Sequence, residues 1–589
     1  MKKYIFISAA IFGASALMTS CDDVLTEKPD SYYEKDTYFT SASKAEMTVL
    51  GIYNSISNLN HYGSCEMATP SSDDMYFING TNVDNTHRDI SHYQLTTNNQ
   101  WISNIWLYNY QGIDRANMAI DGIQHMEGYE NSDKLKQLDA EARFLRAFQA
   151  FDLVKYWGDV PFKTTYSTTY SSAFGARVDR EKIYDQIVDD LNFAKTTLPW
   201  ATSASSPERA TQGAARALLM RVLLQRAGYS LRMNGQSERP DDATRKTYFE
   251  QVVKEWEAFA GSNHGFYTGG YESLFKSFSE LQLNSQESLF EIAFQFESGK
   301  SNGGWWATYN GPEVGAPAAG TQNTAMGRAN AYFRVVPEWY DFFDANDQRR
   351  DVTICRYGYK WDKAKATHVK VDNSSNKGRS KWFPGKWRRE WMALGYKDPN
   401  CTDVNYCVLR YADVVLMAAE AYNELGNTQT AWNLINEVRQ RAGATHVDLT
   451  NYAEIYKHHT GDDPETGKPY VPNVYDLVVP ANATVEGVTP GKTIIDDTDE
   501  QGKIRTAIFW ERGFELAFEG QRKYDLIRWG IMKDVLTLFG MNSTLNSSTT
   551  KGYPAYINFT VGKHELFPIP LNEMQSNPML EGKNNPGYK

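Results

Sequence analysis

Residues 408–443 read VLRYADVVLMAAEAYNELGNTQTAWNLINEVRQRAG, and this stretch decides the fold because it encodes two consecutive amphipathic helices. Apolar residues recur in it every three or four positions, which is the spacing of a helix with one buried face. The two stripes are Leu409, Ala412, Leu416 and Ala419, then Ala431, Leu434, Ile435 and Val438. Gly426 separates the helices and Gly443 ends the second one. Alanine side chains are small, so the stripes predict two antiparallel helices that pack closely.

This helix pair resembles a tetratricopeptide unit, in which such pairs recur about every 34 residues. Apolar periodicity predicts further helices on both sides of it. The stretch EARFLRAFQAFDLVKYWGDVP at 141–161 is a predicted helix ended by Gly158 and Pro161, and its stripe is Phe144, Phe148, Phe151 and Val154. The other predicted helices span residues 103–122, 180–198, 212–227, 248–260 and 504–530.

Between residues 261 and 405 the sequence becomes rich in Gly, Asn, Trp and Tyr, with short strand patterns. LFEIAFQFE at 289–297 alternates apolar with other residues, which predicts a strand with one buried face. It leads into KSNGGWWATYNGPE at 300–313, where Trp305, Trp306 and Tyr309 lie in a polar loop. Such rings are either buried by the loop or held out to stack on a ligand. Loops on a rigid scaffold often carry binding residues.

Length and composition indicate a large, ordered protein with an acidic balance. The chain has 589 residues, of which 13% are aromatic and 23% are charged, and its formal net charge is −11. A nucleic-acid backbone requires a basic footprint, so this balance argues against a nucleic-acid partner. One basic stretch, KWFPGKWRREW at 381–391, is interpreted as a strand pair that packs on the body through its arginines and tryptophans.

The first 23 residues, MKKYIFISAAIFGASALMTSCDD, have the features of a bacterial lipoprotein signal. Two lysines precede an apolar run that is too short to span a bilayer, and the run ends in the lipobox-like sequence LMTSC. We expect a signal peptide at 1–20, lipidation of Cys21 and a tether at 21–40. Asp22 and Asp23 resemble the surface-export signal of Bacteroidetes lipoproteins. The expected location is therefore the outer surface of the outer membrane.

The remaining cysteines leave two interpretations open. They are Cys65, Cys355, Cys401 and Cys407, and none has the paired CxxC spacing of a structural zinc site. Cys401 and Cys407 could form a disulfide in an extracytoplasmic protein, or they could be free buried thiols.

Motifs for catalysis are absent, because the sequence holds no GxxxxGK(S/T), no GxSxG and no GxGxxG that opens a helix. Two stretches carry side chains that can bind a metal. HHTGDDPETGKPY at 458–470 has no regular ligand spacing, and DANDQRRD at 344–351 lacks the glycine and terminal glutamate of a calcium loop. The second stretch is predicted to be a solvated turn that allows a bound calcium, and no cofactor is expected.

Several segments resemble, in this order along the chain, the SusD/RagB family of Bacteroidetes nutrient-uptake lipoproteins. They are EARFLRAFQAFDLVKYWGDVPF at 141–162, LRYADVVLMAAEAYNELGN at 409–427, INEVRQRAG at 435–443, RTAIFWERGFELAFEGQRKYDLIRWG at 505–530, LFPIPLNEMQSNP at 566–578 and NNPGYK at 584–589. Residues 262–400 match this family only loosely, although ligand choice would be encoded there.

The resemblance implies a mainly α fold, with tetratricopeptide-like helix pairs in an α-α superhelix packed against an irregular, loop-rich lobe with a few short strands. It implies an N-terminal helical part at 41–261 and a C-terminal part at 262–589 that carries the ligand-binding loops, interwoven in one globular unit. It also implies a non-catalytic role, in which the protein captures a glycan outside the cell and delivers it to a SusC-like TonB-dependent transporter. The charged residues of the shared motifs are interpreted as structural ion pairs, namely Glu511, Arg512, Glu515 and Arg522.

The resemblance places the ligand site in an arc of aromatic side chains on loops outside the shared motifs. Sugar rings expose C–H faces that pack on flat aromatic rings, while amides, carboxylates and arginines bind their hydroxyls. Trp305, Trp306 and Tyr309 are the leading candidates, and Trp101 joins them. Core packing remains the alternative for Trp101 and for one of Trp305 and Trp306. The candidate hydroxyl partners are Asn104, Asp73 and Arg88.

Three other functions stay open at this point. The same scaffold could capture peptides, as in RagB-type relatives, which predicts binding to a peptide digest. A surface glycoside hydrolase or esterase with an unrecognised site would release reducing ends from polysaccharides. A lid for the transporter without a ligand of its own would give a deletion phenotype that site mutations do not reproduce.

Overall fold

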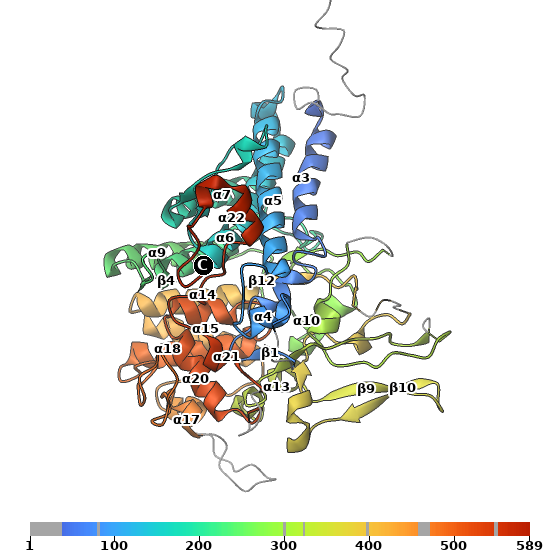
Figure 1. Ribbon diagram of the computed structural model, residues 1–589, viewed down its shortest axis with the longest axis vertical. Helices are drawn as coiled ribbons and strands as arrows, with labels where there is room; N and C mark the ends of the chain where they lie inside the picture. Colours follow the sequence, from blue (N-terminus) through green and yellow to red (C-terminus); the bar gives the residue numbers. More distant parts are fainter. Residues whose placement is uncertain are drawn as a thin grey trace, which may run out of the picture.

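The computed structural model describes residues 38–78, 83–297, 302–321, 324–395, 398, 400–457, 472–546 and 552–588. Helices predominate, and the strands of this described part are short and paired two at a time. Figure 1 shows α3, α5, α6, α7 and α9 (blue to green) above α14, α15, α18 and α20 (orange to red), with the loop-rich segment in yellow-green to their right. The expected mainly α fold with an irregular lobe is confirmed.

The N-terminal part is a series of long helices. Their bounds are α3 (Ala42–Ile56), α5 (Gln100–Gln124), α6 (Asp133–Trp157), α7 (Arg180–Thr197), α8 (Gln212–Ala227) and α9 (Asp242–Glu257). From α5 onward each packs against the next one along the chain, and α3 lies against α5 and α6. Polar side chains cap their starts: Thr211 accepts the backbone N–H of Ala214 at the start of α8. This series is the scaffold on which the N-terminal loops are held.

The helix pair predicted at 408–443 is α14 (Tyr411–Glu424) and α15 (Thr428–Arg441). Gly426 between them has a φ of +81°, in the left-handed region that favours glycine. Asn427 then caps α15 by accepting the N–H of Thr430. α14 also packs on α9 and on α18 (Glu500–Leu516), so the pair connects the N-terminal series to the C-terminal helices.

The remaining helices are shorter. Their bounds are α4 (His87–Ser91), α10 (Tyr271–Ser279), α11 (Trp306–Tyr309), α12 (Trp339–Phe342), α13 (Arg349–Thr353), α16 (Tyr452–Tyr456), α17 (Pro472–Tyr475), α19 (Arg522–Arg528), α20 (Met532–Asn542), α21 (Ala555–Asn558) and α22 (Leu571–Ser576). Among the helices of the described residues, none combines the length and the apolar character needed to cross a bilayer.

The strands form antiparallel pairs, of which β1–β7 and β6–β12 join segments more than one hundred residues apart. The pairs are β1 (Met75–Phe77) with β7 (Phe333–Val335), β2 (Val160–Pro161) with β3 (Arg177–Val178), β4 (Ser230–Leu231) with β5 (Ser237–Glu238), β6 (Ser288–Ile292) with β12 (Tyr406–Arg410), β8 (Ile354–Cys355) with β11 (Phe383–Pro384), and β9 (Tyr357–Asp362) with β10 (Thr367–Asp372). The β1–β7 pair matters most for the site, because it fixes the loop before Phe333 beside the N-terminal loops.

The helix predicted at 504–530 is wrong in extent, because the structure divides it into α18 and α19. The chain turns between them at Phe518 and Gly520, whose φ values of +67° and +88° do not fit a helix. The turn directs the Glu519 carboxylate toward Lys386 and Arg410, and those buried ion pairs outweigh the helical periodicity. The helix predicted at 248–260 likewise begins earlier, as α9.

The strand predicted at 289–297 is also wrong in part. β6 ends at Ile292 and is buried on both faces. The alternation of apolar and polar residues predicted only one buried face, but the polar residue Glu291 is buried as well. Its carboxylate accepts a hydrogen bond of 3.0 Å from the side-chain amide of Asn405. The stretch at 381–391 does pack on the body as predicted, with Trp382 and Trp387 buried, but its strand is limited to β11.

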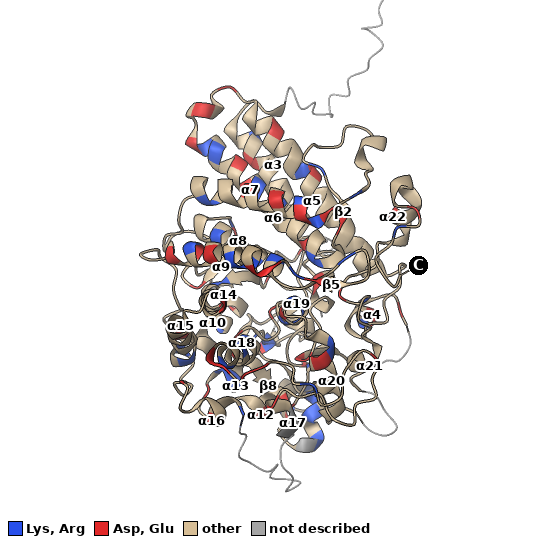
Figure 2. Cartoon of the chain, turned by 90° about the vertical axis from the view of Figure 1, so that its left-hand side faces the viewer, with Lys and Arg blue, Asp and Glu red and all other residues tan. Residues whose placement is uncertain are grey.

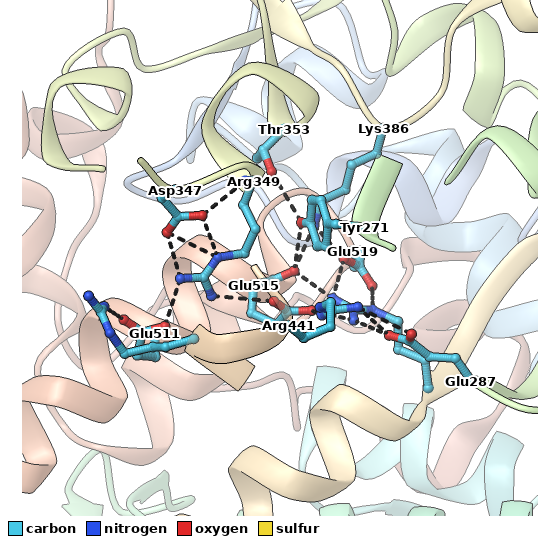
Figure 3. Close-up of polar contacts among 12 residues, drawn as sticks. Tyr271, Glu287, Asp347, Arg349, Thr353, Lys386, Arg441, Glu511, Glu515 and Glu519 are labelled. Carbon is cyan, nitrogen blue, oxygen red and sulfur yellow. Dashed lines mark hydrogen bonds and ion pairs between the residues drawn. The ribbon is translucent and has the colours of Figure 1, made fainter. Parts of the chain in front are cut away.

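A buried ion network explains the charged residues of the shared motifs. Figure 3 shows the carboxylates of Glu511 and Glu515 on α18 directed at arginines from other elements. The network comprises Glu287, Asp347, Arg349, Lys386, Arg410, Arg439, Arg441, Glu511, Glu515 and Glu519. Charges removed from water are tolerated when they are paired and hydrogen-bonded, so this network confirms the interpretation as structural ion pairs. Arg512 and Arg522 pair elsewhere in the interior, with Asp525 and Asp73.

The stretch at 344–351 belongs to the same region, which corrects its interpretation as a solvated turn. Asp347 is 4% exposed and Arg349 is fully buried, with 2.7 Å between their charged atoms. Asp344 pairs with Arg439 at 2.6 Å. Residue spacing alone could not reveal that Asp344 pairs with Arg439 on α15. A calcium ion at this stretch stays an untested prediction.

Candidate functional site

Rings from three separate segments lie together beside the N-terminal end of α5. We call His87, Trp101, Trp305, Tyr309 and Tyr332 the aromatic cluster. Ring centroids are 4.2 Å apart for His87 and Trp101, 5.9 Å for Trp101 and Trp305, 4.6 Å for Trp305 and Tyr309, and 4.5 Å for Tyr309 and Tyr332. Tyr309 is buried at 6% exposure, whereas the other rings are half-buried. The cluster therefore presents parts of several aromatic rings to solvent around one buried ring.

A helix cap positions Trp101 and His87. The side chain of Asn99 accepts the backbone N–H of Trp101 at 3.0 Å, which starts α5. The same side chain donates to the carbonyl of Thr86 at 2.9 Å. Because Thr86 directly precedes α4, this single asparagine fixes the start of α4 beside the start of α5, and the two rings meet.

Two glycines position Trp305. A Cβ on Gly304 would lie 2.7 Å from the ring of Phe294, and one on Gly303 would lie 2.7 Å from the Cβ of Cys401. The backbone therefore approaches its neighbours more closely than any side chain allows. The Trp305 backbone N–H donates to a carbonyl at 2.7 Å, and its indole N–H lies 3.2 Å from the sulfur of Cys401. The double glycine in the sequence thus holds the Trp305 ring in one orientation.

Two predicted site residues, Trp306 and Asp73, belong to the core, which corrects their assignment. Trp306 is 1% exposed, its ring stacks on Tyr406 at 4.0 Å, and its indole N–H donates to the carbonyl of Tyr62 at 2.8 Å. Asp73 is fully buried and pairs with Arg522 at 2.8 Å. The side chains of adjacent residues at the start of a short helix point in different directions. Trp305 and Trp306 therefore cannot both stack on one ligand.

The other two polar candidates, Asn104 and Arg88, lie near the rings and are half-buried. Asn104 follows Trp101 by one turn of α5, and its side-chain oxygen accepts a hydrogen bond of 2.9 Å from Gln100. Arg88 lies next to His87 on α4 and pairs with Asp84 at 3.3 Å. Ligand contact by these residues, and by Trp101 and Trp305, stays a prediction, whereas the burial of Tyr309 corrects its assignment as a stacking ring and makes it a support for the Trp305 ring.

Sequence reasoning missed two members of the cluster, His87 and Tyr332. His87 could have been predicted from the sequence, because it directly precedes the predicted site residue Arg88 and follows a threonine at a helix N-cap position. Tyr332 gave no sequence signal, since only the β1–β7 pairing carries it to the cluster, where its ring also stacks on Phe77 at 5.5 Å.

The aromatic cluster is electrically neutral near neutral pH. Burial lowers the pKa of His87 to about 3, so its imidazole carries no charge in the ordinary pH range. Burial raises the pKa of Tyr309 above its ordinary value, so its hydroxyl keeps its proton. Neutral, half-exposed rings next to an amide and an arginine suit a ligand with apolar faces and hydroxyl edges.

The described cysteines are free and buried, which decides between the two earlier interpretations in favour of free thiols. One buried group in the described residues, His61, Glu66 and Asp152, brings potential metal-ligand atoms within 4.8 Å of one another. Hydroxyl groups already bond its carboxylates: Tyr62 donates to Asp152 at 2.6 Å and Tyr156 donates to Glu66 at 2.5 Å. We therefore interpret this group as part of the polar core. The histidine stretch at 458–470 lies outside the described residues, as do Cys21, the signal peptide and most of the tether.

Comparison with known families identifies this arrangement. The model of the SusD family matches residues 286–588, which is more than half of the chain. The chain belongs to the SusD family. A second family model, described as starch-binding associating with outer membrane, matches residues 23–224. The two matches together cover the N-terminal helices through most of α8 and the chain from residue 286 onward, and the second description associates such proteins with the outer membrane.

Individual SusD relatives align over almost the whole chain. SusD-like protein P25 from Formosa agariphila is 25% identical over 635 aligned residues, covering 100% of this chain and 98% of its own. The crystal structure of a SusD homolog from Bacteroides thetaiotaomicron has a TM-score of 0.73 at 25% identity and covers 94% of this chain and 98% of that one. Surface glycan-binding protein A from the same organism, in complex with laminarihexaose, shares the fold with a TM-score of 0.63 at 18% identity, covering 92% of this chain and 99% of its own.

Proposed function

We propose that this SusD-family protein captures a neutral oligosaccharide or polysaccharide at the cell surface through the aromatic cluster. The observation that supports the proposal most is the neutral group of half-exposed rings held by Asn99 and by the double glycine. A sugar ring would stack its C–H face on Trp305 and Trp101, and Asn104 and Arg88 would bind its hydroxyls. The laminarihexaose complex of a relative with the same fold makes a β-glucan the first ligand to test.

The proposal includes delivery to a SusC-like TonB-dependent transporter from a lipid anchor at Cys21. The lipobox-like sequence at the N-terminus and the family's association with the outer membrane support this part. The protein would act without catalysis, as a binding protein that raises the local ligand concentration at the transporter. Deletion of the gene should abolish growth on the cognate glycan, and restoring a Cys21→Ala chain should not rescue it.

Calorimetric titration of the purified mature protein tests the capture step. Laminarihexaose, maltohexaose, xylohexaose and a peptide digest serve as ligands, and Trp305→Ala is compared with wild type. Truncating a central aromatic anchor removes about 2 kcal/mol or more of binding free energy, so we expect a Kd at least about thirtyfold higher for the variant.

The matched control is Trp361→Ala, because Trp361 is a half-buried ring on β9, outside the aromatic cluster. This control should bind like wild type. Saturable binding of the peptide digest with indifference to all glycans would contradict the proposal and favour peptide capture. Release of reducing ends from any of the glycans would contradict the non-catalytic role.

A further inference from the structure

A hollow lies between α8, α9, α14, α18 and α19, separate from the aromatic cluster. Its volume is about 760 Å³, and none of its lining residues belongs to the cluster. Figure 2 shows α8, α9, α14 and α18 one below another with α19 to their right, and acidic and basic residues are intermixed along α8 and α9. Pockets that bind small molecules have volumes of roughly 300–1,000 Å³, so this hollow has the size of a ligand site. We call it the α8–α19 groove.

Two aromatic rings are fixed where α8 and α19 end in the groove. The backbone N–H of Tyr229 donates to the carbonyl of Arg528 at 2.7 Å, which joins the two helix ends. A Cβ on Gly530, whose φ is +74°, would lie 2.7 Å from the Tyr229 ring, so only glycine lets that ring pack there. Trp529 is held by its indole N–H, which donates to Glu420 at 3.0 Å. Both rings are half-buried and line the hollow.

Charged side chains around the groove are already paired with one another. Arg505 donates from two nitrogens to Glu424, at 2.6 and 3.3 Å. Arg245 lies 3.2 Å from Asp242, and Arg239 lies 3.8 Å from the same carboxylate. A strongly charged ligand would have to disrupt these pairs, so the groove does not favour a polyanion or a polycation.

Hydrogen-bonding capacity nevertheless remains in the groove. A guanidinium group has five N–H donors, and Arg505 has a further nitrogen beyond the two that face Glu424. Tyr229, whose hydroxyl makes no hydrogen bond to another described residue, is one of the lining residues. Buried apolar side chains, including Phe249 and Ile508, complete the wall. The lining therefore combines fixed flat rings, an apolar wall and hydrogen-bond donors.

We propose that the α8–α19 groove is a second binding site for a neutral oligosaccharide, with Tyr229 and Trp529 as its stacking rings. The inference extends the proposed function, because it assigns the same ligand class to a separate site. A chain with two separate sites can hold one polysaccharide at two points, and linked binding raises the apparent affinity for long chains without any new contact.

Fluorine NMR on protein labelled with 5-fluorotryptophan tests this site directly. The chain has 15 tryptophans, and Trp529→Phe and Trp305→Phe variants assign the two diagnostic resonances. Laminarihexaose, maltohexaose and xylohexaose are titrated in turn. We expect the Trp529 resonance to shift saturably with one of them, while the resonance of Trp361 stays in place.

A Tyr229→Ala variant provides the second arm. It should raise the midpoint of the Trp529 shift at least fivefold and leave the midpoint of the Trp305 shift unchanged. If Trp305 responds and Trp529 does not, the proposed function stands and the second site is overturned. If Trp529 responds and Trp305 does not, the second site stands and the assignment of the aromatic cluster is overturned. If neither resonance shifts with any of the three sugars, the second site and the assignment of the aromatic cluster are both overturned.

Discussion

Replacing Glu515 by Gln tests whether the buried ion network holds the helical body to the loop-rich lobe. Glu515 is fully buried, and its oxygens lie 2.6 Å from a nitrogen of Arg410 and 3.3 Å from one of Arg349, with Arg441 as a third partner. The substitution keeps the volume of the side chain and removes its charge. The guanidinium groups of Arg410 on β12, Arg349 on α13 and Arg441 on α15 then lose one of the carboxylates that neutralise them.

The expected loss of stability follows from that geometry. Removing one partner of a buried ion pair costs about 3–5 kcal/mol, because the remaining charge stays buried without compensation. Glu287 also faces Arg410 and Arg441, at 3.0 and 3.1 Å, and it limits the loss, so we expect a value of about 3 kcal/mol, near the lower end of that range. Urea unfolding of the purified mature protein, followed by circular dichroism, measures the free energy of unfolding.

The pH dependence gives this prediction a second check. Burial alone would raise the pKa of Glu515, but Arg441, Arg410 and Arg349 outweigh it and hold the pKa well below the usual range. A carboxylate with a depressed pKa stabilises the fold above its unfolded pKa of about 4.5, and that contribution disappears as the pH falls through the folded pKa. The difference between wild type and Glu515→Gln should therefore be constant between pH 6 and pH 7 and shrink as the pH falls below about 4.5.

The matched control is Glu424→Gln. Glu424 pairs with Arg505, whose side chain is 44% exposed, and partly solvated pairs of this kind contribute about 0–1 kcal/mol. If Glu515→Gln is as stable as this control, the buried ion network does not hold the helical body to the loop-rich lobe.

Three further predictions concern single side chains. Trp306→Ala should destabilise the protein by about 3–5 kcal/mol because its ring is buried, whereas Trp305→Ala should change the free energy of unfolding much less; equal urea midpoints for the two variants would contradict the correction made for Trp306. Burial lowers the pKa of Lys523 from 10.5 to about 7, so between those values the unfolded chain holds a proton that the folded chain has released, and stability should rise with pH across that window. Lys523→Met should reduce this rise without removing it, because burial also lowers the pKa of Lys386 and of Lys533 to about 8; an unchanged slope would exclude Lys523 as a source. Burial raises the pKa of Cys65 to about 12 and that of Cys401 to about 11, so both thiols should react with Ellman's reagent at pH 8 slowly before denaturation and fast after it; rapid reaction of native protein would show that these sites open.

The sequence specified the helices where one periodic stripe faced one neighbour. The pair at 408–443 and the helix at 212–227 came out with their predicted bounds or close to them, because capping residues and glycines marked their ends. The prediction failed where ion pairs and hydrogen bonds between distant segments determine the backbone conformation or the burial of a polar side chain. The turn at Glu519 and the buried carboxylate of Glu291 are set by partners far away in the sequence, and periodicity cannot represent them.

The candidate site was predicted in part for the same reason. Trp101, Trp305 and Tyr309 could be selected from local sequence, since each follows a cap or a glycine pair. The choice between Trp305 and Trp306 depended on Tyr406 and on the carbonyl of Tyr62, which no local pattern reveals. Tyr332 depended entirely on strand pairing across more than two hundred residues.

A crystal structure with the best-binding oligosaccharide tests the central claim most directly. We expect a sugar ring whose C–H face lies on the half-exposed rings of Trp305 and Trp101, with hydroxyls within hydrogen-bonding distance of Asn104 or Arg88. An oligosaccharide bound elsewhere, with the aromatic cluster free of sugar at saturating ligand, would contradict the assignment of that cluster as the capture site.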